Sequence, residues 1–309
     1  MDLKQSSRML ARGIAVLLIV STVAGLGASN VYANVSDSTA AAALRARYGA
    51  LQNQLRLNQF QKPIYLDSRE SAESVAGDIY ALIKHPFTAT SAALNGPARW
   101  CEIMMLHVNT KFCRAITDGR AAALQVHIGK KHDQPVDEAQ RVDFDYRVIA
   151  DTPEYLKVTL IAEAGPFSTR DYRVILEAIP LDSGATFMHF TYSYGYGFAG
   201  RLAMQTYLST IGSRKVGFTV VGKQADGGSQ YIGGMRGLVE RNTMRYYLAI
   251  EAFLGALSTP PQAQLEKRLH DWFAAVERYP RQLHELELRE YLEMKRREFR
   301  RQQADRSAG

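Results

Sequence analysis

Polar and apolar side chains alternate through four segments between residues 141 and 197, and these segments are rich in Val, Ile, Tyr, Phe and Thr. A period of two is typical of strands that bury one face. The breaks between the segments, at residues 151–153, 165–166 and 180–184, contain Pro or Gly and are too short to hold a crossover helix. Neighbouring strands must therefore run antiparallel, and the pattern predicts a meander with one apolar face.

The period changes to helical between residues 232 and 257, where apolar side chains recur at alternating steps of three and four. Pro260 and Pro261 end this pattern. We expect this long helix to cover the apolar face of the sheet. Its stripe consists of Met235, Val239, Asn242, Tyr246, Ala249, Phe253 and Leu257.

The remaining segments alternate between helical and extended patterns. Residues 36–60 predict an amphipathic helical arm that ends at Pro63. Further elements follow along the chain: strands at 64–66, 74–83, 110–116 and 121–128, helices at 88–94, 97–106 and 198–211, a strand-like run at 215–221, a glycine-rich loop at 222–229, and two helices hinged at Pro280.

The N-terminus has the features of a secretory signal. Lys4, Arg8 and Arg12 precede an apolar run that is short for a membrane span, and residues 31–33 offer small side chains where a signal peptidase cleaves. We expect cleavage before Asn34 and a periplasmic protein, with an uncleaved anchor as the alternative. Loss of three basic residues and Asp2 lowers the formal charge from +7 to +5. So diffuse a charge does not indicate a nucleic-acid partner.

These patterns divide the chain into four predicted parts. They are a signal peptide (1–33), an N-terminal helical arm (34–62), a central domain (63–258, with an insertion at 198–230) and a C-terminal helical extension with a charged tail (259–309). We expect a monomer.

The chain has two cysteines, Cys101 and Cys113. An even number so close together in an exported chain favours one disulfide. Free thiols in a core are the alternative. The spacing fits no zinc pattern, so we expect no metal, and no motif indicates a cofactor.

The order of elements resembles the START-like (SRPBCC, helix-grip) superfamily, and two stretches are similar to uncharacterised exported bacterial proteins of that kind. These are Ala-Gly-Asp-Ile-Tyr-Ala-Leu-Ile-Lys-His-Pro-Phe at 76–87 and Arg-Trp-Cys-Glu-Ile-Met-Met at 99–105. The resemblance implies an α+β fold in which a curved antiparallel β-sheet wraps around the long C-terminal helix, here with flanking helices at both ends. The insertion and both flanks depart from the simplest members, and either could cover or fill a cavity.

The resemblance also implies a binding protein for a hydrophobic small molecule such as a lipid, sterol or hopanoid. In that family the helix and the concave sheet face line the pocket, which leaves two sets on the last strand: Met188, Phe190, Tyr192, Tyr194 and Tyr196, or the opposite set with His189. From the first set we predict that Met188, Phe190, Tyr192 and Tyr194 bind the ligand. The helix residues predicted to bind it are Met235, Val239, Asn242, Tyr246, Ala249 and Phe253. Plain core packing is the competing interpretation, although a buried amide at Asn242 needs a partner.

Two alternative functions remain. The first is a cyclase-like or hydrolytic enzyme in which His189 and a carboxylate such as Asp145 act as general acid and base in the same cavity. The second is an envelope scaffold with a filled core. The match of residues 195–200 to G-x-G-x-x-G does not indicate a dinucleotide site, because the flanking strands are antiparallel.

The C-terminal helix places Leu292 and Phe299 at heptad spacing among mixed charges. A solvated helix is the simplest interpretation. Contact with a membrane surface or a partner helix through this segment is the alternative.

Overall fold

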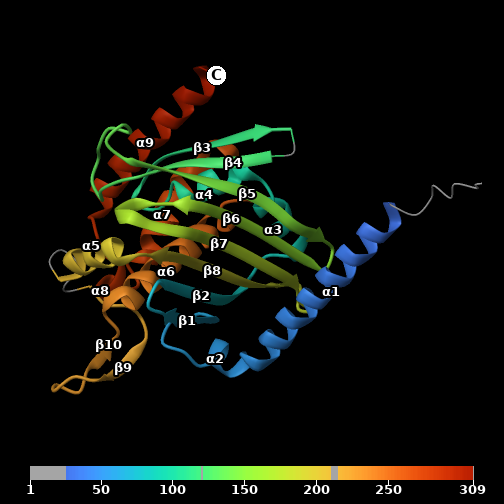
Figure 1. Ribbon diagram of the computed structural model, residues 1–309, viewed down its shortest axis with the longest axis horizontal. Coiled ribbons are helices and arrows are strands. Elements are labelled where there is room, and N and C mark those ends of the chain that lie inside the picture. The colour runs from blue at the N-terminus through green and yellow to red at the C-terminus, as the bar shows by residue number, and fades with distance from the viewer. Residues whose placement is uncertain (1–25, 120, 210–214, 309) are drawn as a thin grey trace, which may run out of the picture. The chain divides into compact units, whose positions relative to one another are not determined.

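One antiparallel sheet of eight strands wraps around a long helix (Figure 1). The computed structural model describes residues 26–119, 121–209 and 215–308. The strand order is β1-β2-β8-β7-β6-β5-β4-β3. The strands are β1 (Ile64–Glu70), β2 (Ser74–Ile83), β3 (Thr110–Asp118), β4 (Ala121–Ile128), β5 (Gln140–Thr152), β6 (Tyr155–Ala164), β7 (Thr169–Pro180) and β8 (Thr186–Tyr196).

The chain divides into two units, Met1–Ser36 and Asp37–Gly309, and the fold described here is that of the second. Its helices are the end of α1 (Leu26–Ala50), α2 (Gln52–Arg56), α3 (Phe87–Leu94), α4 (Pro97–Met104), η1 (Pro166–Ser168), α5 (Phe198–Ser209), α6 (Gly234–Gly255), α7 (Pro261–Val276), α8 (Pro280–Leu283) and α9 (Leu288–Ala308). A small hairpin joins β9 (Val220–Lys223) to β10 (Ser229–Tyr231).

Helix α6 lies across one face of β1, β2 and β8. It approaches the sheet closely at Gly77 of β2, where an added Cβ would lie 2.4 Å from the Thr243 hydroxyl oxygen. A larger residue there would push the helix away from the strand, so glycine sets the packing distance. A curved antiparallel sheet thus packs around one long helix, and the predicted α+β helix-grip architecture is confirmed.

The helical arm covers the opposite, outer face of the sheet. Its apolar side chains Ala41, Leu44, Leu51 and Leu55 form a separate buried cluster with side chains of β5 to β8. Those strand positions alternate with the positions that face α6, as a period of two requires. These four side chains of the arm therefore do not fill the space between the sheet and α6.

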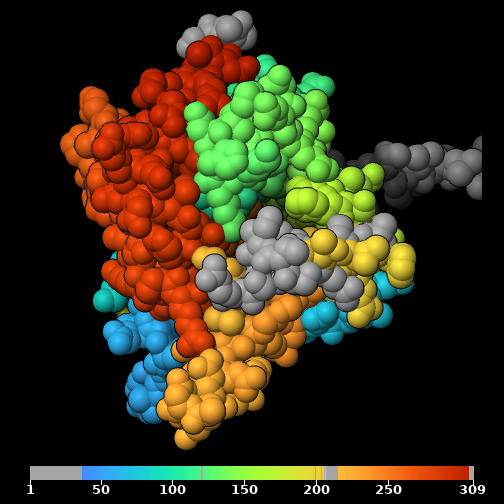
Figure 2. Space-filling view, turned by 90° about the vertical axis from the view of Figure 1, so that its left-hand side faces the viewer, coloured from blue at the N-terminus to red at the C-terminus, as the bar shows by residue number. Residues whose placement is uncertain are grey.

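The C-terminal extension is part of the core, which contradicts the interpretation of α9 as a solvated helix. Leu292 and Phe299, the two heptad positions, are buried together with Tyr291 and Met294. Figure 2 shows α9 in red beside the green segment that follows β4, and Arg297 and Arg301 of α9 both form ion pairs with Asp133 there. The apolar face of this helix is occupied within the protein.

The insertion is anchored to α6 by Glu240, a fully buried carboxylate. It accepts hydrogen bonds from the backbone N–H groups of Phe218 (2.6 Å) and Thr219 (2.9 Å) and from the hydroxyl of Ser68 on β1 (2.6 Å). These donors satisfy a charge that would otherwise be costly to bury. The segment before the β9–β10 hairpin is thereby fixed to the helix.

Cys101 of α4 and Cys113 of β3 form a disulfide with an Sγ–Sγ distance of 1.99 Å, as predicted. Most of the predicted signal peptide lies outside the described residues. Among those that are described, no helix has the length and apolar character needed to cross a membrane.

Candidate functional site

A cavity of about 710 Å³ lies between the sheet and the middle of α6. Its volume is within the range of small-molecule sites in proteins, roughly 300–1,000 Å³. It is lined by His107, Asn109, Thr110, Ile128, Gly129, Lys130, Lys131, His132, Gln134, Glu138, Gln140, Pro166, Phe167, Thr169, Tyr172, Tyr192, Tyr194, Met204, Leu238, Arg241, Asn242, Arg245, Tyr246 and Glu285.

Four of the predicted ligand-binding residues line this cavity: Tyr192, Tyr194, Asn242 and Tyr246. They come from the end of β8 and from the middle of α6. The Asn242 carboxamide oxygen accepts a hydrogen bond from Arg245 at 3.4 Å. The partner that a half-buried amide requires is thus a side chain on the same helix. Contact of these residues with a ligand remains a prediction.

The other six predicted residues are in the packed core, outside the cavity lining: Met188, Phe190, Met235, Val239, Ala249 and Phe253. Phe253 shows why. The Arg268 guanidinium lies 4.3 Å above its ring and also pairs with Glu102 of α4 at 2.6 Å. Helices α4 and α7 occupy the space beside this end of α6, so the apolar stripe faces the cavity only in its middle, at Asn242 and Tyr246.

Tyrosine rings form one wall of the cavity. Tyr172 of β7 stacks on Tyr194 with ring centroids 5.2 Å apart, and Tyr192 lies 5.4 Å from Tyr246 of α6. Burial raises the pKa of Tyr172 to about 12, so its hydroxyl stays protonated at neutral pH. The Tyr194 hydroxyl is buried and has no hydrogen-bond partner among the residues that the structure describes.

The imidazole of His107 is a second hydrogen-bond donor beside these rings. It stacks on the Tyr246 ring, with ring centroids 4.9 Å apart. Burial lowers its pKa well below the usual value, and the nearby charges of Arg245 and Lys295 add to the effect. The neutral ring accepts a hydrogen bond at Nδ1 from the Asn109 backbone N–H at 3.2 Å, so Nε2 carries the proton. That buried Nε2 also has no partner within the described part of the chain.

Another part of the cavity lining is basic. The Glu285 carboxylate forms ion pairs with Arg245 (2.6 Å), Lys131 (2.7 Å) and Lys215 (3.6 Å). Burial would raise the pKa of Glu285, but Arg245 and the two lysines outweigh it and hold that pKa below its usual value. The carboxylate is therefore charged at neutral pH and surrounded by more positive charges than it neutralises.

The structure contradicts the predicted pairing of His189 with Asp145. His189 lies on the outer face of the sheet, away from the cavity, with Nε2 2.9 Å from Asp78 and Nδ1 3.2 Å from Glu177. Asp145 forms an ion pair with Arg147 on β5, separated from β8 by β6 and β7. The pairing failed because strand alternation left open which face carried His189.

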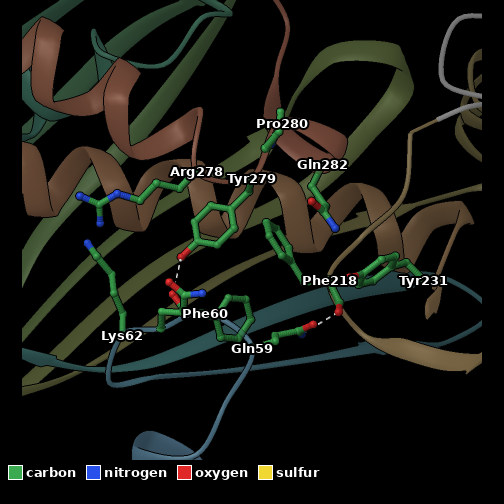
Figure 3. Close-up of a pocket in the computed structure, with 10 residues that line it drawn as sticks. Gln59, Phe60, Lys62, Phe218, Tyr231, Arg278, Tyr279, Pro280 and Gln282 are labelled. Atoms are coloured by element: carbon green, nitrogen blue, oxygen red, sulfur yellow. Dashed lines mark hydrogen bonds between the residues drawn. The ribbon is translucent and has the colours of Figure 1, made fainter. Parts of the chain in front are cut away.

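A second pocket, of about 530 Å³, lies where the arm, the insertion and the C-terminal extension meet (Figure 3). Phe60, Phe218 and Tyr279 pack against one another in it, with centroids 5.4 to 6.1 Å apart. The Tyr279 hydroxyl donates to the Phe60 carbonyl at 3.1 Å, and the Gln59 amide donates to the Phe218 carbonyl at 2.8 Å. These contacts join three parts of the chain and indicate a structural junction.

Comparison with known proteins finds similarity in structure alone. No protein-family model and no curated protein matches the chain. Norcoclaurine synthase from Thalictrum flavum is similar over 47% of this chain and 91% of its own, with 10% identity and a TM-score of 0.34. Human StAR-related lipid transfer protein 5 is similar over 56% and 90%, with 8% identity and a TM-score of 0.30. A protein from Chromobacterium violaceum is similar over 48% and 95%, with 15% identity and a TM-score of 0.26. Sequence identities and TM-scores as low as these say nothing about what this chain binds.

Proposed function

We propose that this chain binds one hydrophobic or amphipathic small molecule, such as a lipid, sterol or hopanoid, non-covalently between the sheet and α6. The observation that carries the proposal is the cavity itself, about 710 Å³ in volume and lined by aromatic and aliphatic side chains together with many polar and charged ones. Apolar surface buried there would supply roughly 25 cal/mol per Å² toward affinity, less the cost of ordering the ligand.

The polar groups in the wall would orient the ligand. The Tyr194 hydroxyl and the His107 Nε2–H are buried without partners in the described structure. An unsatisfied buried donor costs about 1–3 kcal/mol, and an acceptor on a ligand would recover part of that cost. Asn242, on the neighbouring surface of α6, adds an amide to the same wall.

We further propose that the protein is exported, acts in the periplasm as a monomer and transfers its ligand there. The leader-like sequence of residues 1–33 supports export. The Cys101–Cys113 disulfide is typical of an oxidising compartment. A mature N-terminus at Asn34 in the periplasmic fraction would support this localisation, and an intact N-terminus in the membrane fraction would contradict it.

The two alternatives are less well supported. A filled scaffold core does not accommodate a cavity of this volume. The enzyme alternative placed His189 and Asp145 in the cavity, and neither residue lines it.

Binding of Nile red, a neutral dye that fluoresces in apolar surroundings, tests the proposed function. Wild-type protein should take up one dye per chain, and unlabelled hydrophobic ligands should displace it. The comparison is with a Leu238→Trp variant, in which the indole should occupy the cavity and prevent the dye from binding. Equal dye binding by both proteins would place the dye elsewhere and count against the cavity.

A further inference from the structure

Two phenylalanines are exposed on elements that also form the cavity wall. All 12 phenylalanines of the chain lie in the described residues, and the others are buried or half-buried. Phe167 of η1 is 65% exposed, and Phe198, the first residue of α5, is 86% exposed. Phe167 itself lines the cavity, and α5 contributes Met204 to the same lining. The cavity therefore reaches the surface beside these exposed rings.

Helix α5 packs directly on η1. An added Cβ at Gly200 of α5 would lie 2.9 Å from the Ser168 carbonyl oxygen and 3.3 Å from that of Phe167. Met204 follows Gly200 by about one turn and is only 7% exposed. The side of α5 that carries Gly200 and Met204 therefore faces the protein. Figure 1 shows this helix where β8 ends.

The other side of α5 is apolar and faces solvent. Phe198, Arg201 and Leu202 are three and four residues apart, so they share one side of the helix. Leu202 is 56% exposed and Arg201 is exposed as well. A surface helix with a single apolar side turns that side toward the core, whereas α5 also carries large apolar side chains on its outer side. We call Phe167, Phe198, Arg201 and Leu202 the α5 patch.

The charge of the α5 patch is a single guanidinium group. The α5 sequence contains no Asp or Glu, and Arg201 is its one charged residue. Arg201 forms no ion pair within the described part of the chain. The neighbouring Arg170, by contrast, pairs with Glu73 at 3.5 Å and with Asp171 at 3.6 Å, so those charges compensate one another.

This combination is complementary to a phospholipid surface. A guanidinium group matches the geometry of a phosphate, which every phospholipid head group carries. Large apolar side chains beside a basic one on a surface helix are typical of segments that lie in the interfacial layer of a bilayer. The position of the α5 patch also favours a bilayer over a protein partner. Phe167 belongs both to the patch and to the cavity, and a bilayer is the phase in which a water-insoluble ligand is dissolved.

We propose that the α5 patch binds the surface of a phospholipid bilayer, with the Phe and Leu side chains inserted below the head groups and Arg201 on a lipid phosphate. The cavity would then open toward the membrane. The role of the bilayer as the source of the ligand rests on the proposed function, whereas membrane binding itself does not. Membrane contact is thereby assigned to α5 and not to α9, whose apolar side chains Leu292 and Phe299 are buried.

Co-sedimentation with vesicles of phosphatidylethanolamine and phosphatidylglycerol tests the inference. The double variant Phe198→Gln, Leu202→Gln should bind these vesicles at least about tenfold more weakly than wild type, because it removes two large apolar side chains from the contact. The matched control is Leu57→Gln, Val221→Gln. It also removes two exposed apolar side chains, 74% and 54% exposed, but away from the α5 patch, and should bind as wild type does.

The contribution of Arg201 is measured separately. Arg201→Gln should weaken binding to the vesicles with phosphatidylglycerol about fivefold, the factor expected for one basic residue near an anionic surface. The same substitution should change binding to phosphatidylcholine vesicles less, because their surface carries no net charge.

An added indole reports insertion directly. The two tryptophans of the chain, Trp100 and Trp272, are 1% and 2% exposed, so their emission should not respond to vesicles. Phe198→Trp should show a blue shift of its emission when vesicles are added, and lipids with brominated acyl chains should quench it. Leu57→Trp, at an equally accessible position away from the α5 patch, should show neither change.

The outcomes separate this inference from the proposed function. Equal vesicle binding by wild type and the double variant, or no spectral change in Phe198→Trp, would overturn the inference. A wild-type dimer that the double variant abolishes, without vesicle binding, would also overturn it and make the α5 patch an interface between two copies of the chain. Nile red binding without vesicles tests the cavity alone, and the double variant should retain it because neither residue lines the cavity. Loss of vesicle binding with retained dye binding therefore supports the inference, and a wild-type protein that binds vesicles but no dye would contradict the proposed function alone.

Discussion

The ammonium group of Lys295 and the carboxylate of Glu298 form an ion pair of 2.7 Å in which neither side chain is exposed to solvent. Lys111 of β3, also 0% exposed, contacts the other oxygen of Glu298 at 3.0 Å. Lys295 donates to the backbone carbonyls of His107 (2.6 Å) and Thr110 (2.8 Å). The C-terminal helix is therefore joined to the sheet by buried charges, next to the cavity residue His107.

Replacing Glu298 by Gln should destabilise the protein strongly, because it leaves Lys111 and Lys295 buried without a compensating charge. Loss of one partner from a buried ion pair costs about 3–5 kcal/mol. Urea unfolding of Glu298→Gln measures the change in free energy. The matched control is Glu293→Gln on the exposed side of α9, whose ion pair with Arg289 is open to solvent and should contribute little to stability. Equal effects of the two substitutions would show that α9 does not dock as described.

Two tryptophan substitutions on α6 should have opposite consequences. Ala249 is 0% exposed and lies in the packed core, so Ala249→Trp overpacks it and should cost about 3 kcal/mol or more. From the sequence alone we would expect this substitution to abolish binding with little effect on folding, whereas the burial of Ala249 predicts a loss of stability. Leu238 lines the cavity, so Leu238→Trp should fill the space, change stability by less than about 1 kcal/mol and abolish dye binding. A comparison of thermal unfolding and Nile red titration for both variants tests this; the opposite pattern would place the cavity elsewhere on α6.

Removal of the Tyr194 hydroxyl should separate ligand binding from stability. This hydroxyl has no partner in the described structure, so Tyr194→Phe should leave the free energy of unfolding unchanged or raise it by up to about 1 kcal/mol. If a bound ligand accepts a hydrogen bond from it, the same substitution should weaken binding about fivefold, the factor expected for one neutral hydrogen bond of about 1 kcal/mol. Calorimetric titration with a ligand identified by extraction provides the measurement. A clear loss of stability would mean that the hydroxyl already has a partner within the protein.

The cluster around His189 should make stability depend on pH. Burial would lower the pKa of His189, but Asp78 and Glu177 outweigh it and raise that pKa above 6.5. Burial would raise the pKa of Glu177, but His189, Tyr155 and Lys157 lower it to about 2. The stabilisation from His189 is therefore complete below pH 6.5 and lost as the pH rises through the raised pKa. That from Glu177 is complete above pH 4.5 and lost as the pH falls toward about 2.

The thermal midpoint of the wild-type protein should thus fall between pH 6 and pH 9, and that of His189→Gln should fall less. The exposed His270 provides the control, because His270→Gln should retain the wild-type profile. Parallel profiles for wild type and His189→Gln would contradict the proposed protonation of His189.

Much of the fold could be predicted because each central strand buries one face. The alternation between residues 141 and 197 reports that burial directly, and helix α6 at Gly234–Gly255 matches the predicted 232–257. The sequence misled at α9, where Lys295 and Glu298 are buried. From sequence alone, a charged residue on a helix is predicted to face solvent unless its ion-pair partner is known. Here the partner of Glu298 is Lys111, on the distant strand β3.

The site was predicted in part for a related reason. Helical spacing identifies the face of α6 that turns toward the sheet, and Tyr246 of that face lines the cavity whereas Phe253 is in the packed core. Spacing cannot show where along the stripe the packing leaves a void, because that depends on α4 and α7. Arg241 and Arg245 were missed, although their spacing with Leu238 gives a second stripe along the helix.

Native mass spectrometry of the protein purified from its own cells, followed by organic extraction, tests the central claim most directly. The account predicts a stoichiometric bound molecule with an apolar body in the wild-type protein, and its absence from Leu238→Trp. An empty wild-type protein that also takes up no lipid, sterol or single-chain amphiphile would contradict the account.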